Sequence, residues 1–204
     1  MSLYARWFLP PLLDLAMRNA EATRFRKRLV PGASGVVLEI GVGSGLNLTF
    51  YASGVDRVVA IDPSRELLRM ARKRLEATHA PIDLVEASAE ALPLARASID
   101  TAVMTFTLCS IPDPARALAE IRRVLKPSGE LRFAEHGLSP DAAVQRWQHR
   151  FNPMWRRVAG GCNLDRRMDE LIRSAGFNLV ELHAEYAKGP RPMAYVYCGR
   201  ARPG

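Results

Sequence analysis

The sequence predicts a single α/β domain with a mostly parallel sheet, and three observations carry this prediction. Short apolar runs alternate with helical patterns along most of the chain, which is typical of a parallel sheet with helices on both faces. A glycine-rich turn, GVGSG, follows the first apolar run. Near the C-terminus, two strand-like runs flank Lys188-Gly189-Pro190 without a helix between them, which predicts an antiparallel hairpin. A chain of 204 residues fits one domain with one core.

The elements are expected in the following order. A helix around residues 12–28 ends at Pro31-Gly32 and makes residues 1–32 an N-terminal helical cap. Strands are predicted near 36–40, 57–61, 82–86, 99–104 and 130–134, with helices at about 45–53, 64–77 and 113–125 between them. Residues 138–170 form a helical lid in which Pro153 predicts a kink or a split. The hairpin strands cover residues 177–185 and 193–199.

Composition narrows the class of protein. The net charge of +8 indicates either a phosphate-bearing partner or a solvated, arginine-rich surface. Cys109, Cys162 and Cys198 are odd in number and far apart in sequence, which argues against a disulfide framework or a zinc cluster and favours a reducing cytoplasm. Pro10-Pro11 and Asp14 interrupt the apolar run at residues 7–17, so neither a signal peptide nor a membrane span is expected.

The turn after the first predicted strand indicates a nucleotide-type cofactor. Gly41, Gly43 and Gly45 allow a sharp turn and a close approach of the backbone to a ligand. The spacing is G-x-G-x-G, since position 46 is leucine where a dinucleotide loop of the G-x-G-x-x-G kind has glycine. Asp62 follows Gly41 by 21 residues and closes the second apolar run, where an acid can bind a ribose diol.

From about residue 36 to residue 197, the chain resembles class I S-adenosylmethionine (SAM) methyltransferases. The segments that carry the resemblance are LEIGVGSG, IDPS, AEALPLARASID, LAEIRRVLKPSGEL and FAEHG. The chain is most similar to the branch that holds bacterial phospholipid N-methyltransferases, quinone C-methyltransferases and alkyl-thiol S-methyltransferases. Leu108-Cys109-Ser110, Glu135-His136, the stretch 152–155 and residues 161–164 resemble the thiol enzymes in particular. The resemblance implies a Rossmann-like, seven-stranded, mostly parallel sheet that ends in an antiparallel hairpin.

The resemblance also implies roles for particular residues in binding SAM and its product S-adenosylhomocysteine. Glu39 would fix the glycine loop, and the loop would line the methionine part of SAM through Gly41, Val42, Gly43, Gly45 and Asn47. Asp62, followed by Pro63, would hold the ribose. Ser88 and Ala89 stand at the adenine edge, where Ser88 replaces the usual aspartate, so recognition is weakened or moved to Glu90. Thr105, Phe106 and Thr107 would lie beside the sulfonium.

Methyl transfer from a sulfonium is an in-line displacement that needs no metal, and no metal site is expected here. A thiol acceptor must first ionise, so a nearby base or positive field would help. His136 is the candidate base, with Glu135 expected to orient its ring; the alternative is a histidine that only bonds loop backbone. Cys109 and Cys162 are interpreted as small buried thiols rather than as nucleophiles or metal ligands.

The predicted activity is methyl transfer from SAM to a small or lipophilic acceptor, with a thiol favoured and a lipid amine or a quinone-like compound as alternatives. A nucleic-acid methyltransferase, supported only by the net charge, and a non-catalytic SAM-binding protein remain as further alternatives. An arsenite methyltransferase is disfavoured because the cysteines do not cluster in the sequence. The aromatic stripe is formed by Val144, Trp147, Phe151, Trp155 and Val158, opposite several arginines. It indicates a lid that gives an apolar acceptor pocket, a membrane-surface face, or plain packing onto the sheet. Tyr4, Trp7 and Phe8 are candidates to cover the same pocket.

Overall fold

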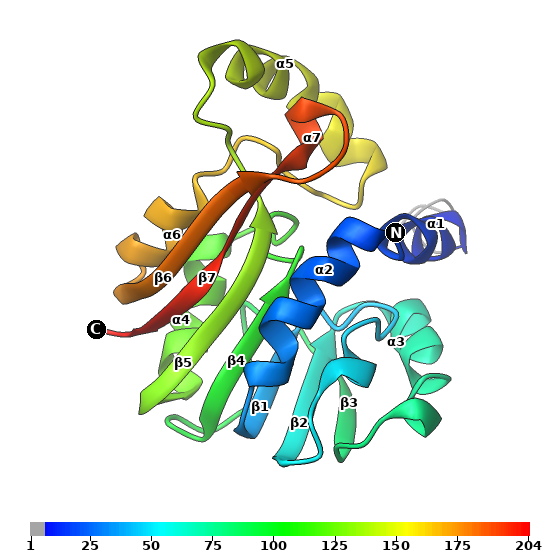
Figure 1. Ribbon diagram of the computed structural model, residues 1–204. Coiled ribbons are helices and arrows are strands. Elements are labelled where there is room, and N and C mark those ends of the chain that lie inside the picture. The colour runs from blue at the N-terminus through cyan, green and yellow to red at the C-terminus, as the bar shows by residue number, and fades with distance from the viewer. Residues whose placement is uncertain (1–6) are drawn as a thin grey trace.

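A computed structural model describes residues 7–204 (Figure 1), so the predicted role of Tyr4 lies outside the described residues. Seven strands form one sheet in the order β3-β2-β1-β4-β5-β7-β6. β1 to β5 run parallel, whereas β7 pairs antiparallel with both β5 and β6. The strands are β1 Gly35–Ile40, β2 Val55–Asp62, β3 Ile82–Glu86, β4 Ile99–Thr105, β5 Leu125–His136, β6 Phe177–Tyr186 and β7 Tyr195–Pro203. The predicted sheet with a C-terminal hairpin is confirmed.

Helices cover both faces of the sheet, and the alternation of side chains along β1 shows why. Leu38 and Ile40 pack in the same cluster as buried residues of α4 and α6, while Val37 packs in a second cluster with residues of α3. Phe25 and Leu29 of α2 pack on Ala134 of β5 and on β7 in a third cluster. The helices are α1 Leu9–Met17, α2 Ala20–Leu29, α3 Arg65–Arg72, α4 Pro114–Val124, α5 Ala142–Val158, α6 Met168–Ser174 and α7 Arg191–Ala194.

The segment between β5 and β6 stands apart from these layers. In Figure 1, α5 and α7 lie together beyond the carboxyl ends of the parallel strands, on the side where a parallel sheet binds ligands. Val144, Gln148 and Asn152 form the buried face of α5. Trp147 and Phe151, in contrast, stack on each other at 5.2 Å and are 52% and 40% exposed. Of the alternatives for this stripe, plain packing fits Val144, whereas Trp147, Phe151 and Val158 face solvent.

Two local predictions were wrong, and of the two outcomes predicted at Pro153 the split does not occur. The N-terminal helix is two helices, because the side chain of Asn19 accepts the backbone N–H of Ala22 and begins α2 anew. Residues 45–53 hold turns and the short 3₁₀ segment Leu48–Phe50 instead of a helix. Pro153 lies inside α5 without splitting it. The lid also continues into α6, a helix that the sequence pattern did not predict.

No helix in residues 7–204 is long and apolar enough to cross a membrane.

Candidate active site

The glycine loop after β1 forms an opening at the carboxyl edge of the sheet. Gly41, Gly43 and Gly45 all have positive φ, at 66°, 55° and 84°. A Cβ atom on Gly41 would lie 2.3 Å from the side chain of Thr107, so glycine is needed there for packing. A Cβ on Gly43 would meet only the carbonyl oxygen of Gly41, at 3.9 Å. The space over Gly43 is therefore open to a ligand.

Asp62 closes this opening from the end of β2. One carboxylate oxygen accepts the backbone N–H of Gly43 at 3.0 Å, and the other accepts that of Ser64 at 2.8 Å. Burial raises the pKa of Asp62, while these two amide bonds act in the opposite direction. Because a carboxylate oxygen can accept more than one hydrogen bond, both oxygens retain capacity for a diol. Pro63 links Asp62 to the N-cap of α3, Ser64.

A buried polar network lies beneath the glycine loop. The side-chain oxygen of Asn47 accepts from Arg26 at 3.1 Å, and its amide donates to the hydroxyl of Thr105 at 2.9 Å. Glu39 is 1% exposed, and its Oε2 atom has no hydrogen-bond partner within the described residues. Burial raises the pKa of the Glu39 carboxyl to about 7, although nearby Tyr51, Asn47 and Arg26 lower it. An unpaired buried carboxylate oxygen is a natural partner for a bound cation.

Two other parts of the predicted cofactor site are held by packing and by short hydrogen bonds. Val42 is buried, and its backbone N–H donates to the carbonyl of Ile61 at 2.9 Å. The Ser88 hydroxyl lies 3.2 Å from one Glu90 carboxylate oxygen, and the other oxygen accepts from the backbone of Asp113 at 2.7 Å. Ala89 between them is buried. Glu90 is thus already engaged in shaping the loop that the sequence assigns to the adenine edge.

The loop after β4 brings Phe106 and Thr107 against the glycine loop. Phe106 adopts φ 55°, a conformation that a non-glycine residue keeps only when its surroundings impose it. Glu135 imposes it from β5, because its two oxygens accept the backbone N–H groups of Thr107 at 2.8 Å and Cys109 at 3.2 Å. Burial raises the pKa of Glu135 to about 7, while the loop amides oppose this shift.

This arrangement corrects the role expected for Glu135. Successive residues of a strand point to opposite sides, so Glu135 and His136 diverge. The Glu135 carboxylate is bonded to the loop rather than to the His136 ring. Glu135 is therefore a positioning residue for the loop.

His136 lies at the end of β5, between a cavity and two sulfur atoms. Its ring is 4.7 Å from the ring of Phe106, centroid to centroid. Both residues line a cavity of about 180 Å³, whose wall also includes Phe25, Met193 and Val196. The cavity is mainly apolar, which suits a lipophilic molecule.

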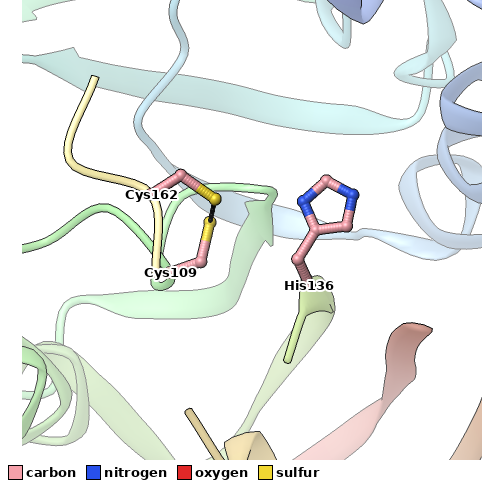
Figure 2. A group of neighbouring side chains, drawn as sticks. All are labelled: Cys109, His136 and Cys162. Atoms are coloured by element: carbon pink, nitrogen blue, oxygen red, sulfur yellow. Dashed lines mark hydrogen bonds between the residues drawn. The ribbon is translucent and has the colours of Figure 1, made fainter. Parts of the chain in front are cut away.

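Cys109 and Cys162 meet on the other side of His136. Their Sγ atoms are 3.5 Å apart, and Figure 2 shows the His136 ring facing this pair. The hydrogen bond shared with Cys109 and the neighbouring His136 ring lower the pKa of Cys162 to about 5, against the effect of burial, while the pKa of Cys109 rises. The sequence-based inference that the cysteines are too far apart to cluster was wrong for these two, since 52 intervening residues fold back between positions 109 and 162.

Three residues that hold this region were not predicted as site residues. Arg166 donates to the carbonyls of Leu108 at 2.5 Å and Ile111 at 2.8 Å. The backbone and side chain of Asn163 both donate to the carbonyl of Cys109, each at 2.8 Å. The indole nitrogen of Trp155 is buried beside Cys162. Only the tertiary fold reveals these contacts. Arg166 and Asn163 bond to residues more than 40 positions away, and the place of the Trp155 indole depends on which side of α5 faces Cys162.

Comparison with known proteins places this geometry in a family. A family model described as a methyltransferase domain matches residues 38–133. Human thiol S-methyltransferase TMT1B is 34% identical over 203 residues, and the match covers 96% of this chain and 81% of the human protein. The chain belongs to the SAM-dependent methyltransferase family. As such it is an enzyme, and SAM is its cofactor.

One further relative and one solved structure are similar to this methyltransferase. Phosphatidylethanolamine N-methyltransferase of Cereibacter sphaeroides is 35% identical over 155 residues, covering 72% of this chain and 74% of that protein. The structure of Burkholderia thailandensis 1,6-didemethyltoxoflavin-N1-methyltransferase, which has S-adenosylhomocysteine bound, matches with a TM-score of 0.67. It is 20% identical and covers 96% of this chain and 83% of its own, so it shows a shared fold.

The residues of this methyltransferase fit SAM in three ways. Among residues 7–204, the space over Gly43 is open and Oε2 of Glu39 lacks a hydrogen-bond partner, and Asp62 has oxygens with remaining acceptor capacity. When bound, SAM supplies an activated methyl group, so the chain itself needs to bind and orient the acceptor.

Proposed function

We propose that this methyltransferase transfers the methyl group of SAM to the sulfur of a lipophilic thiol. The match to human thiol S-methyltransferase TMT1B along 96% of the chain carries the proposal. The mainly apolar cavity, with His136 in its wall, supports it from the geometry. The cofactor would lie across the glycine loop, with Asp62 on the ribose and Ser88, Ala89 and Glu90 near the adenine.

His136 is proposed to promote the ionisation of the acceptor thiol. A free thiol has a pKa of about 8.5 and is mostly protonated at neutral pH, whereas the thiolate is the nucleophile. The His136 ring borders the cavity, so it can take the proton of a thiol bound there. Glu135 contributes indirectly by fixing the loop that carries Phe106 and Thr107.

A panel of acceptors tests the proposed substrate class. With isotopically labelled methyl-SAM, we expect the highest kcat/KM for a long-chain alkyl thiol, detected as the labelled thioether. The matched control is an alkyl alcohol of the same chain length, which cannot ionise and should not react. A higher kcat/KM for phosphatidylethanolamine vesicles or for a demethylated quinone would replace the thiol by one of those acceptors.

SAM affinity is expected to rise with pH between about pH 5 and pH 7 because of Glu39. Its carboxyl has a pKa of about 7 in the free protein, so at lower pH it must lose a proton before it can pair with the SAM ammonium group. The affinity should then fall by up to about tenfold for each pH unit below 7. Calorimetry in buffers of different ionisation enthalpy measures the proton that is released when SAM binds. Glu39→Gln should abolish this proton release. An affinity that does not vary over this range would refute this placement of the ammonium group.

We also propose that the enzyme is a cytoplasmic protein that contacts a membrane surface through α1 and α5. Leu15 of α1 and Trp147 and Met154 of α5 are 70%, 52% and 60% exposed. Arg150 and Arg157 on α5 are exposed as well. Exposed apolar side chains beside cations favour the interface of an anionic membrane.

Sedimentation with anionic vesicles tests this contact. Trp147→Glu combined with Met154→Glu should reduce the bound fraction severalfold, because a carboxylate is repelled by anionic headgroups. Val180→Glu is the matched control, since Val180 is 53% exposed but lies on β6. Equal binding by the wild type and the double variant would exclude this face as the contact.

A further inference from the structure

Three ligand-type side chains from distant parts of the chain converge, and one of them, His136, lines the cavity. Cys109 comes from the loop after β4, His136 from the end of β5, and Cys162 from the loop after α5 (Figure 2). One donor atom from each residue lies within 4.8 Å of the others. Two thiols and an imidazole are the ligand types that zinc prefers in proteins.

The spacing of the two sulfur atoms is close to that of a zinc site. Zn–S bonds of about 2.3 Å and Zn–N bonds of about 2.0–2.1 Å in a tetrahedron place two sulfurs about 3.8 Å apart and each sulfur about 3.6 Å from the nitrogen. The Cys109 and Cys162 sulfurs are already 3.5 Å apart. A disulfide requires about 2.05 Å between the sulfurs, so the observed separation lies much nearer to that of two zinc ligands.

The backbone around the three residues is fixed by bonds that do not involve the donor atoms. Glu135 accepts the N–H of Cys109, and Asn163 donates twice to the Cys109 carbonyl, which ties the first cysteine to the residue after the second. Both cysteines are buried, at 1% and 8% exposure. A site with fixed ligands and limited access to water needs little rearrangement to take an ion.

We propose that Cys109, Cys162 and His136 are three ligands of a zinc ion whose fourth position takes the acceptor thiol. Three protein ligands and one open position are the arrangement of catalytic zinc sites, whereas structural sites have four protein ligands. Because His136 also lines the cavity, the acceptor would approach the ion from that side. The inference replaces the sequence-based expectation that no metal is bound.

This proposal rests on the proposed thiol methylation and specifies how the thiol is ionised. The acceptor R–SH binds zinc through sulfur and releases its proton to solvent, because a coordinated thiol is deprotonated. The sulfur then forms a bond to the methyl carbon as the carbon–sulfonium bond of SAM breaks, which gives R–S–CH₃ and S-adenosylhomocysteine. The zinc keeps its charge throughout. In this form of the mechanism, His136 acts as a ligand instead of as the base.

Zinc binding by the full chain tests the site without reference to activity. The protein, kept reduced with a phosphine, is titrated with Zn²⁺ against a chromophoric chelator, and Co²⁺ is used as a spectroscopic probe of thiolate ligation. We expect one tightly bound zinc per chain and a cobalt–thiolate charge-transfer band. Cys109→Ala, Cys162→Ala and His136→Ala should each weaken zinc binding by more than about 100-fold.

Cys198→Ala is the matched control, because Cys198 is also buried but packs with Phe25 and Leu29 in another cluster. It should retain one zinc and the cobalt band, and thermal unfolding checks that every variant is folded. Cys109→Ser serves as a second variant if the alanine variant does not fold. The site would be overturned if the protein bound less than one zinc per chain, or if Cys198→Ala and the ligand variants had equal affinity for zinc. A Cys109–Cys162 disulfide that persists in the phosphine-treated protein would also overturn it.

The outcomes for zinc and for the acceptor can be separated. Zinc-loaded protein should methylate an alkyl thiol faster than zinc-free protein at pH 7. Equal rates would overturn the catalytic role of zinc and leave His136 as a free base with the thiol acceptor intact. Tight zinc binding by a protein that methylates a lipid amine and no thiol would instead overturn the proposed function while retaining the metal site.

Discussion

Gly43→Val is expected to reduce SAM affinity by more than about a thousandfold, or roughly 4 kcal/mol. The space beside Gly43 contains no protein atom closer than the Gly41 carbonyl, so a valine side chain would occupy the path of the cofactor. Calorimetric titration with SAM and S-adenosylhomocysteine measures the loss. Thermal unfolding of the same samples shows whether the variant remains folded.

Gly160→Val separates occlusion of the cofactor from backbone strain. Gly160 has φ 62°, close to the 55° of Gly43, and a Cβ there would make ordinary contacts with Leu9 and Leu13. This control should therefore suffer a similar conformational penalty and keep its SAM affinity. Normal SAM binding by a folded Gly43→Val protein would mean that the loop is only a turn.

His136→Ala should lower the single-turnover rate of alkyl-thiol methylation at pH 7 by about 10²–10⁴-fold while leaving SAM affinity unchanged. The deficit should shrink as the pH rises to 10, because the thiol then ionises without assistance. His183→Ala is the matched control, since His183 is an exposed residue of β6 that bonds to Glu181. If His136→Ala kept full activity at pH 7, or lost activity only in proportion to weaker SAM binding, His136 would have a structural role and no part in thiol ionisation.

The same pH profile is expected whether His136 takes the proton itself or holds zinc, since both roles promote thiol ionisation. The metal content of the sample distinguishes them. In the first case a chelator leaves the wild-type rate unchanged, and in the second it reproduces the deficit of His136→Ala.

The sheet could be predicted from sequence because its parallel strands appear as short apolar runs that can be recognised without knowledge of the tertiary structure. The apolar runs of β1, β2 and β4 are bounded by glycines and acids, and their order with the helices admits few topologies. The N-terminal helix was mispredicted because Asn19, a local cap, lies within a continuous helical pattern. Residues 45–53 were predicted to be a helix, but Gly41 and Gly43 before the segment and Gly45 at its start have positive φ and direct the chain into turns.

The site was predictable only where its residues follow the strands directly. Gly43 follows β1 closely and Asp62 ends β2, and the fold brings the two together as expected, with a hydrogen bond that the sequence did not predict. The pairing of Cys109 with Cys162 depends instead on the path of α5, which no periodicity reveals. Glu135 was assigned to His136 by adjacency, whereas strand alternation turns it toward the loop.

A crystal structure of the enzyme with S-adenosylhomocysteine and an alkyl methyl thioether would show where the cofactor and the product of thiol methylation bind. We expect the ribose hydroxyls on the Asp62 carboxylate, the adenosyl sulfur facing the loop at Phe106 and Thr107, and the thioether sulfur beside His136 in the cavity. A thioether bound away from His136, or a cofactor that leaves the space over Gly43 empty, would contradict this expectation.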